Sequence, residues 1–435
     1  MGTEEPASDH AVWDNDTYKR WKKNSRYLYD VCVAQEMDWP SLTVDWFRDR
    51  KEGSDKVDQK LLIGTQTGDG SENYLKVMKL TMPSMEEGAI VSEKYNSDTR
   101  EVGSFGGGST EVKLDASIVM VHEGEVNVAR INPNNEFLIA SKSPNGSVLV
   151  FDYRKHPSFP TAGDKLCRPQ FRLTGHTEEG FALSWDPHSN ARLLSGANDG
   201  KVCVWELPGS GAKSETKVDP IFTREEHTGS VNDVAWHAKY ANLFASVGDD
   251  SRIITWDTRD GTTSTRPRVE GAHDGGLVNC VSFNPFNEFL LATGASDDCV
   301  ALWDMRNMKS PLCKIDDCHA GCVDKVTWCP QRETVLASSG TLGNDKGEKT
   351  IKVWDIARIG DEQNDDDAMD GPPELLFAHM GHVGDVNDMC WNPNDPWMMA
   401  SVDGNNYLHC WKMDNQYCCP NEQIPVDAVA DDDLE

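Results

Sequence analysis

Three kinds of side chain that can accept or donate protons recur together along this chain. A histidine is followed 19 or 20 residues later by a serine or threonine, and a tryptophan or phenylalanine closes each set. The six sets are His122, Ser141 and Phe151; His176, Ser195 and Trp205; His227, Ser246 and Trp256; His273, Thr293 and Trp303; His319, Ser338 and Trp354; and His382, Ser401 and Trp411. Three sets also have an aspartate six residues before the aromatic residue, at Asp199, Asp250 and Asp297. A serine hydrolase uses such a triad to attack an acyl group.

The number of copies favours a structural role over that chemistry. An enzyme needs one catalytic set, whereas buried polar groups must be satisfied in every repeat. The chain also lacks the G-x-S-x-G turn of the α/β-hydrolases. We therefore predict no catalytic residues and interpret the sets as hydrogen-bonded clamps, represented by His176, Ser195, Asp199 and Trp205, and by His227, Ser246, Asp250 and Trp256. The other sets have Asn145, Glu348 and Asn405 in place of the aspartate, so their clamps should be weaker or differently paired.

The spacing of the histidines predicts the fold. Successive histidines lie 46 to 63 residues apart, close to the period of about 40 to 45 residues of four-stranded propeller blades with loop insertions. Lys60 to Gly64 and Tyr74 to Leu80 read as strands of one more blade that lacks the histidine. Ser41 to Phe47 alternates like a strand, and we expect it to close the ring as the outer strand of the last blade. The prediction is an all-β, seven-bladed β-propeller over residues 38–415.

The segment before the propeller is predicted to be an amphipathic, basic helix over residues 14–37. Apolar residues recur at helical spacing, with lysines and arginines mainly between them, at Tyr18, Trp21, Leu28 and Cys32. Residues 1–13 carry no pattern, and we expect them to be a mobile tail.

Two acidic segments interrupt or follow the repeats. Residues 361–374 form an insertion with the sequence DEQNDDDAMDGPPE, and an apolar run from Leu375 follows at once. Carboxylates held beside an apolar floor suit a basic amphipathic helix as the ligand. Residues 416–435 form the second segment, which we expect to be a solvated acidic tail.

The charge balance narrows the choice of partners. The chain has 72 acidic and 42 basic residues and a net charge of −30. Such a surface repels phosphate backbones and anionic lipids and attracts cationic proteins, so we predict no direct contact with nucleic acid or membranes. There is no apolar run of the ~18 residues that a membrane span requires and no secretory signal, so we expect a soluble, intracellular protein.

No cofactor or metal site is predicted. The thirteen cysteines are scattered, and an odd number cannot all pair in internal disulfides. Cys318, His319 and Cys322 have the wrong order for haem attachment, and His319 already belongs to a clamp. The glycine-rich stretches Gly103 to Ser109 and Gly209 to Ser214 lack the spacing of a phosphate-binding loop.

Several motifs carry a family resemblance. Gly175-His176 and Trp256-Asp257 resemble the signature of WD-repeat (WD40) proteins. More specific are YKRWKKN (18–24), WPSLT (39–43), HEGEVN (122–127), VFDY (150–153) followed by KHP (155–157), and DGPPELLF (370–377). From about residue 17 to Trp411 the chain resembles the retinoblastoma-associated histone-binding proteins, which include the small subunit of chromatin assembly factor.

The resemblance implies a nuclear, non-enzymatic scaffold that binds core histones and joins deacetylase, other histone-modifying and nucleosome-assembly complexes. It implies two sites. A side groove would take a histone helix with Tyr27, Leu28, Val31, Asp367, Asp370 and Phe377. The mouth of the central channel, called the top face below, would take a basic peptide with Trp39, Glu125, Asn127, Glu179 and Phe181, to which Asp385 adds a carboxylate absent from the family pattern. Other departures from that pattern are Asn232, Cys322 and Asp324 at the top face and Ala378 in the groove floor.

Two alternative functions stay open. The sequences WDTR and WDMR, with Arg259 and Arg306, resemble the box by which WD-repeat substrate adaptors bind cullin-type ubiquitin ligases. Either arginine can equally form a strand-end ion pair. The other alternative is an acidic WD-repeat factor of ribosome assembly, a class expected to lack the Pro-Pro loop and the basic helix.

Overall fold

The computed structural model describes residues 16–83, 95–96, 101–102, 112–161, 163–209, 215–260, 267–341, 349–364, 367–369 and 371–414. The predicted tails at 1–13 and 416–435 lie outside these residues, as do Glu348 and Asp370.

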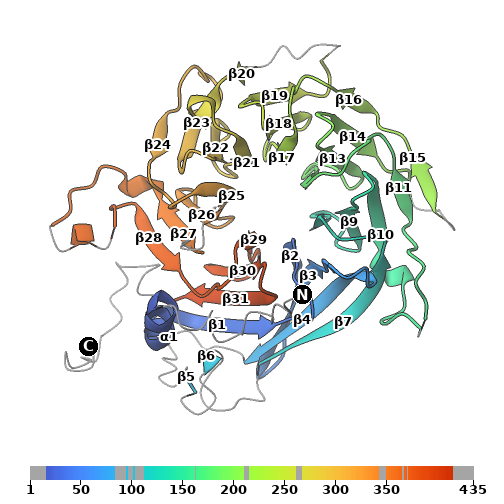
Figure 1. Ribbon diagram of the computed structural model, residues 1–435, viewed down its shortest axis with the longest axis horizontal. Helices are drawn as coiled ribbons and strands as arrows, with labels where there is room; N and C mark the ends of the chain where they lie inside the picture. The colour runs from blue at the N-terminus through green and yellow to red at the C-terminus, as the bar shows by residue number, and fades with distance from the viewer. Residues whose placement is uncertain are drawn as a thin grey trace, which may run out of the picture.

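Seven sheets stand around a central axis as the blades of a propeller (Figure 1). In each blade the strands run antiparallel from the channel outward. The first blade consists of β2 (Val44–Glu52), β3 (Lys56–Gly64), β4 (Asn73–Pro83) and β7 (Lys113–His122). Because β3 and β4 contain the two segments predicted as strands of a blade without the histidine, the prediction of seven blades is confirmed.

The remaining blades follow the chain in order. The second has β8 (Val128–Ile131), β9 (Leu138–Lys142), β10 (Val148–Asp152) and β11 (Phe171–Leu173), with β15 (Thr216–Val218) parallel at its edge. The third has β12 (Ala182–Trp185), β13 (Arg192–Gly196), β14 (Val202–Glu206) and β16 (Phe222–Arg224). The fourth has β17 (Val231–Trp236), β18 (Leu243–Gly248), β19 (Ile253–Asp257) and β20 (Arg268–Val269).

The fifth blade has β21 (Val278–Phe283), β22 (Leu290–Ala295), β23 (Val300–Asp304) and β24 (Cys313–Ile315). The sixth has β25 (Cys322–Trp328), β26 (Val335–Thr341), β27 (Ile351–Asp355) and β28 (Leu375–His379). The seventh has β29 (Val386–Trp391), β30 (Met398–Asp403), β31 (Tyr407–Met413) and β1 (Tyr29–Glu36). A short hairpin of β5 (Tyr95–Asn96) and β6 (Glu101–Val102) lies outside the blades, and the 3-10 turns are η2 (Tyr153–Lys155), η3 (Ala272–Gly275), η4 (Ile356–Arg358) and η5 (Asp367–Met369).

The ring closes with a different strand from the one predicted. The outer strand of the seventh blade is β1, which pairs antiparallel with β31 and places Cys32 opposite Trp411. Residues 41–47 instead lead into and begin β2, the innermost strand of the first blade. Both segments alternate in hydrophobicity, and periodicity alone does not say which edge each one completes.

The helix before the propeller is also shorter than predicted. Helix α1 (Asp16–Leu28) ends where β1 begins, so the prediction of a helix to residue 37 is wrong. Val31 and Val33 are β-branched and favour an extended backbone, and the open edge of β31 supplies hydrogen bonds for it. The helical spacing of Cys32 with Leu28 was therefore accidental.

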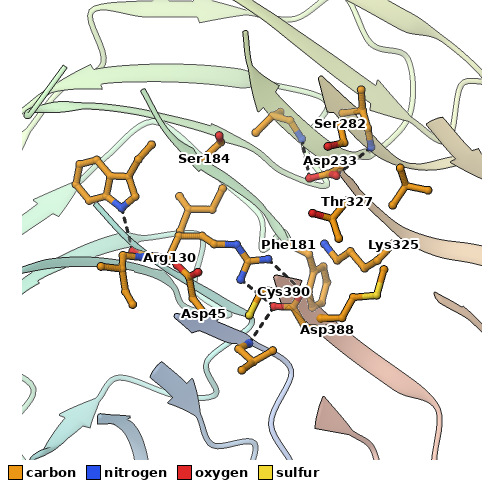
Figure 2. Close-up of a pocket in the computed structure, with 18 of the residues that line it drawn as sticks. Asp45, Arg130, Phe181, Ser184, Asp233, Ser282, Lys325, Thr327, Asp388 and Cys390 are labelled. Atoms are coloured by element: carbon orange, nitrogen blue, oxygen red, sulfur yellow. Dashed lines mark hydrogen bonds and ion pairs between the residues drawn. The ribbon is translucent and has the colours of Figure 1, made fainter. Parts of the chain in front are cut away.

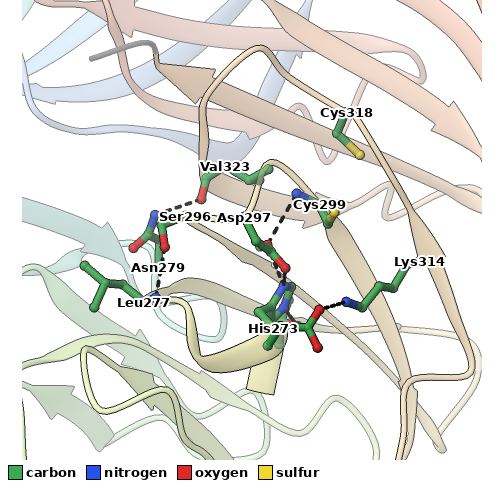
Figure 3. A network of polar contacts seen from close by, with 12 residues as sticks. His273, Leu277, Asn279, Ser296, Asp297, Cys299, Lys314, Cys318 and Val323 are labelled. Carbon is green, nitrogen blue, oxygen red and sulfur yellow. Dashed lines mark hydrogen bonds and ion pairs between the residues drawn. The ribbon is translucent and has the colours of Figure 1, made fainter. Parts of the chain in front are cut away.

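The six histidine–hydroxyl pairs are all hydrogen-bonded in the interior, with N···O distances of 2.7 to 3.1 Å. Asp199, Asp250 and Asp297 each contact Nδ1 of their histidine. Figure 3 shows the fifth-blade clamp, in which Asp297 accepts from His273 at 2.8 Å and from the backbone N–H of Cys299. These bonds satisfy buried polar atoms that join the outer and inner strands of a blade.

The three sets without the aspartate solve the same problem differently. Nδ1 of His122 bonds to the carbonyl of Gly124 at 2.9 Å. In the seventh blade, Nδ1 of His382 contacts Asp403 at 3.1 Å, two residues before the expected position. Nδ1 of His319 is buried and has no partner in the described part of the chain.

Candidate functional site

Helix α1 is held against the sixth and seventh blades by a chain of buried polar groups. The indole Nε1 of Trp21 donates to the hydroxyl of Tyr29 at 2.8 Å, and this hydroxyl lies 2.7 Å from Nδ1 of His379. Nε2 of His379 lies 3.0 Å from Nδ1 of His409. Because the tyrosine hydroxyl has a single proton and accepts from Trp21, it donates to His379, whose Nε2 then donates to His409. One direction of proton donation thus runs from α1 into the seventh blade.

His382 lies beside this chain, and the imidazoles of His379, His382 and His409 come within 4.8 Å of one another. Their nitrogens are largely committed, since those of His379 face Tyr29 and His409 while those of His382 face Ser401 and Asp403. Burial lowers the pKa of both His379 and His409 well below the ordinary value. The cluster therefore works as a neutral hydrogen-bond network. Sequence reasoning missed it because residues far apart in the chain supply it.

The predicted side-groove residues fall into three groups. Tyr27 and Leu28 are half-buried at the end of α1, and Leu28 packs against the cluster below. Phe377 is buried, stacks on Trp411 and meets Tyr29 edge-on, so it supports the floor from within. Asp370 and the side chain of Asp367 lie outside the described residues.

Val31 does not belong with the groove residues. It lies on β1 and is buried in the cluster between the seventh and first blades with Val44 and Met398. The error follows from the helix boundary, because a helix continued to residue 37 would have placed Val31 near Leu28. Sequence reasoning also passed over Leu376 and Met380, which flank Phe377 and pack partly buried on the same cluster as Leu28.

The acidic insertion leaves the ring beside β28 (Figure 1). It contains η5, where Met369 is 86% exposed. Gly371 follows with a φ of 134°, a conformation that favours glycine, and there a Cβ would come within 2.8 Å of Leu375. The glycine therefore lets the loop turn tightly onto the start of β28.

At the top face the structure brings Glu125, Asn127 and Glu179 together. Nδ2 of Asn127 donates to Glu179 at 3.2 Å, and Nε2 of Gln66 donates to Glu125 at 3.3 Å. Glu125 and Glu179 line a pocket of about 510 Å³ between the first and second blades. Neither carboxylate forms an ion pair with a described residue, so both can accept from a cationic ligand.

Phe181 belongs to a second pocket, the central channel, of about 360 Å³. Its ring is 44% exposed, and Figure 2 shows it near Lys325 and Asp388. Asp388 forms a bidentate pair with Arg130 at 2.8 and 3.2 Å. Burial raises the pKa of the neighbouring Asp45 to about 6, against the attraction of Arg130. The channel thus has a polar wall whose charges largely compensate one another.

The other predicted top-face positions are more dispersed. Asp385 is exposed and Trp39 is half-buried, and neither lines the two pockets just described. Asn232 is engaged between blades, because its Nδ2 donates to Asp249 at 2.8 Å and to the carbonyl of Val278. A family glutamate replaced by this asparagine removes one carboxylate from the rim.

The two arginines of the ligase-like boxes form strand-end ion pairs. Arg259 clasps Asp257 with two hydrogen bonds of 2.8 and 2.7 Å, and Arg306 clasps Asp304 in the same manner. Their side chains are 66% and 65% exposed. The pairing fixes each guanidinium while leaving N–H donors toward solvent.

Comparison with known families accounts for this combination of helix and propeller. A family model that describes the histone-binding protein RBBP4 and its counterpart in the CAF1 complex matches residues 16–84, and a WD domain, G-beta repeat, model matches residues 167–206, 218–257, 265–304 and 374–412. The chain belongs to this histone-binding WD-repeat family. The family-specific match covers α1, β1 and the first blade as far as β4, and the repeat matches fall on the third, fourth, fifth and seventh blades.

Membership in the histone-binding family identifies a histone-binding scaffold built on a propeller. The predicted family and fold are thereby confirmed. None of the helices in the described part of the chain is long and apolar enough to span a membrane.

Proposed function

We propose that this protein is a non-enzymatic, nuclear scaffold that holds histones for chromatin-assembly and chromatin-modifying complexes. The observation that carries the proposal is the family match over residues 16–84, which coincides with a helix docked on the propeller by a buried hydrogen-bond chain. Other subunits would supply the chemistry, because the repeated His–Ser–Asp sets serve as buried clamps.

The side groove is proposed to take a basic amphipathic helix of a core histone. Leu28 offers apolar surface above the cluster that contains Tyr29 and Phe377. Burying one aliphatic side chain of the ligand there contributes roughly 1.5–3 kcal/mol. The acidic insertion at 361–374 supplies carboxylates for arginine or lysine at the rim, and such charge-assisted hydrogen bonds add orientation as well as affinity.

The top face is proposed to take an extended basic peptide from a histone or a cofactor. Glu125 and Glu179 carry only neutral hydrogen-bond donors from within the described chain, so a cation improves their electrostatic environment. Phe181 offers a ring face at the channel mouth for the same cationic group.

The side groove is tested by titrating purified protein with core histones. The variant Asp367→Ala/Asp370→Ala should bind at least about ten-fold more weakly, because two rim carboxylates are removed. A matched control, Glu52→Ala/Asp55→Ala, makes the same change in net charge at the exposed β2–β3 turn and should bind like wild type. Equal affinity of wild type and the groove variant would remove the side groove from the proposal.

A second candidate is a substrate adaptor of a cullin-type ubiquitin ligase. It is favoured by the exposed, pre-oriented guanidinium groups of Arg259 and Arg306. Loss of the ligase core from pull-downs of Arg259→Ala/Arg306→Ala, with histone binding unaltered, would support it, and retention would contradict it. The third alternative, ribosome assembly, is disfavoured by the helix and family match at 16–84.

A further inference from the structure

Lys142 is a lysine with no access to solvent. It is the last residue of β9, and its relative exposure is 0%. Its Nζ donates to Oγ of Ser195 at 2.9 Å and to the carbonyl of Gly196, both on β13 of the next blade. No carboxylate of a described residue lies within ion-pair distance of it. A buried lysine without a paired acid is rare, so a specific role is to be expected.

The ammonium group takes the place of a tryptophan in the third-blade clamp. In the fourth to seventh blades, the indole Nε1 of the closing tryptophan donates to the clamp hydroxyl, as in the bond from Trp256 to Ser246 at 2.8 Å. Trp205 donates instead to the carbonyl of Thr174, and Ser195 receives Lys142 from the second blade. This clamp therefore connects two blades, whereas the others act within one.

The segment that runs over Lys142 is residues 177–181, called the strap below. Gly180 lies directly above the amine, because a Cβ at this position would come within 2.8 Å of Nζ and 2.6 Å of the Cα of Ala197. The strap is also tied by Asp199, which accepts from the backbone N–H of Thr177 at 2.9 Å, and by the carbonyl of Glu179, which accepts from the N–H of Asn198 at 2.9 Å.

Glu179 and Phe181 flank Gly180, so the two side chains assigned to the top face project from the segment that the lysine supports. We propose that Lys142 is a positioning residue for the top-face peptide site, holding the strap in place through its bonds to Ser195 and Gly196. This inference rests on the proposed binding of a cationic peptide at the top face.

The position of the amine adds an electrostatic consequence. Burial lowers the pKa of Lys142 to about 7, with partial compensation from Asp199. The charged or titratable groups that face it are Asp199, Cys203 and His176, and the strap above carries the carboxylates Glu178 and Glu179.

Of these neighbours, none with a shifted pKa changes charge between pH 6 and 9. Although burial opposes it, hydrogen bonds from His176 and Thr177 lower the pKa of Asp199 to about 2. Burial raises the pKa of the Cys203 thiol to about 11 and lowers that of His176 below its usual range. Loss of the Lys142 proton over this interval therefore leaves the top face more negative, and a cationic peptide should bind more tightly at the higher pH.

Hydrogen–deuterium exchange tests the positioning role without any ligand. In Lys142→Met, which keeps the length of the side chain but removes its donors, amides of the strap should exchange about ten-fold faster than in wild type. The matched control is Asn132→Ala, which removes a 3.0 Å bond from Asn132 to the carbonyl of Asn190 between the same two blades, at the other end of β9. Unchanged strap exchange in Lys142→Met, or equal acceleration in both variants, would overturn the proposal.

Peptide binding tests the electrostatic consequence. The probe is an acetylated, unstructured peptide with three arginines, whose charge is constant over the interval. Its affinity for wild type should rise about three-fold from pH 6 to pH 9, whereas Lys142→Met should bind more weakly than wild type at pH 9 and show a flat profile. A wild-type profile as flat as that of the variant contradicts the charge effect. If wild type does not bind the peptide at any pH, the proposed top-face function fails, and the exchange measurement still decides the positioning role.

Discussion

The hydroxyl of Tyr29 lies 2.7 Å from Nδ1 of His379, and this bond joins the strand that closes the ring to the outer strand of the sixth blade. The same hydroxyl accepts from Trp21, so a single oxygen couples helix α1, β1 and β28. The wall and the floor of the proposed side groove therefore share one buried polar contact.

Replacing Tyr29 by phenylalanine should destabilise the protein and loosen α1. The substitution leaves Nε1 of Trp21 and Nδ1 of His379 buried without partners, at a cost of about 1–3 kcal/mol for each group. Urea unfolding measures the loss, and faster tryptic cleavage at Lys22 and Lys23 reports the loosening. Tyr153→Phe, at a half-buried tyrosine in η2, serves as the control and should change stability by less than about 0.5 kcal/mol. A Tyr29→Phe protein as stable as that control would show that the hydroxyl contributes little.

The seventh-blade clamp gives a prediction that the sequence pattern alone would have assigned to the wrong residue. Asp403 is fully buried and accepts from His382, from the N–H of Gly384 and from the N–H groups of Asn405 and Tyr407. Asp403→Ala should therefore cost about 3 kcal/mol or more, as expected for loss of a buried, multiply bonded charge. Asn405→Ala, at the position that the repeat offset indicates, should cost less than about 1 kcal/mol. Thermal or urea unfolding of the two variants compares them directly, and the reverse order would contradict the assignment.

Repeat periodicity predicted the ring because His, hydroxyl and aromatic residues occupy fixed places in each blade. It failed where the structure departs from the period. The closing strand, β1, is contributed by residues next to a helix, and only pairing with β31 decides its conformation. The buried chain from Trp21 to His409 and the support of the strap by Lys142 join residues of different blades, so no local pattern reveals them. The family resemblance supplied Glu125, Asn127 and Glu179, which the structure brings together, but it also carried Val31, whose burial removes it from the groove.

Stability should fall as the pH is lowered below about 6.5. Burial lowers the pKa of His122 to about 4 and that of His319 to about 3, and it also depresses the pKa values of His379 and His409. Since an unfolded histidine titrates near 6.5, the unfolded chain binds protons that the folded chain refuses, and each such histidine removes about 1.4 kcal/mol per pH unit below that value. Asp45 acts in the opposite direction below pH 6, because its folded pKa is raised to about 6.

Urea unfolding at pH 7.5, 6.0 and 5.0 measures this dependence. His319→Asn should reduce the slope by about one histidine, whatever its effect on absolute stability. Asp199 and Asp403, whose pKa values are lowered to about 2 by their hydrogen bonds against the effect of burial, contribute only below about pH 4. A stability that is constant between pH 7.5 and 5.0 would contradict the neutral assignment of these histidines.

The carboxylates of the top face should govern the affinity for a cationic peptide. Glu179→Gln keeps the bond from Asn127 but removes the charge, and it should weaken binding about five-fold, the equivalent of about 1 kcal/mol for an exposed ion pair. Glu178→Gln is the matched control, since its side chain is exposed one residue earlier on the same strap and lines neither pocket. Isothermal titration at 50 and 300 mM salt should show a smaller salt dependence for Glu179→Gln than for wild type. Equal losses in both variants would indicate a general charge effect without a defined site.

Gly180→Ala should damage the top face and spare the side groove. The added methyl group meets the Cα of Ala197 at 2.6 Å, and this backbone contact cannot yield as a flexible side chain would. The strap must therefore move outward, displacing Glu179 and Phe181 at a cost of about 1–3 kcal/mol in stability. Shortening the lysine in Lys142→Ala/Gly180→Ala removes the contact with Nζ but leaves the one with Ala197, so the double variant should recover little peptide affinity. Histone-helix affinity, measured in parallel, should match wild type in both variants, because α1 and β28 do not contact the strap. Full recovery of peptide affinity in the double variant would show that the strap rests on the lysine alone.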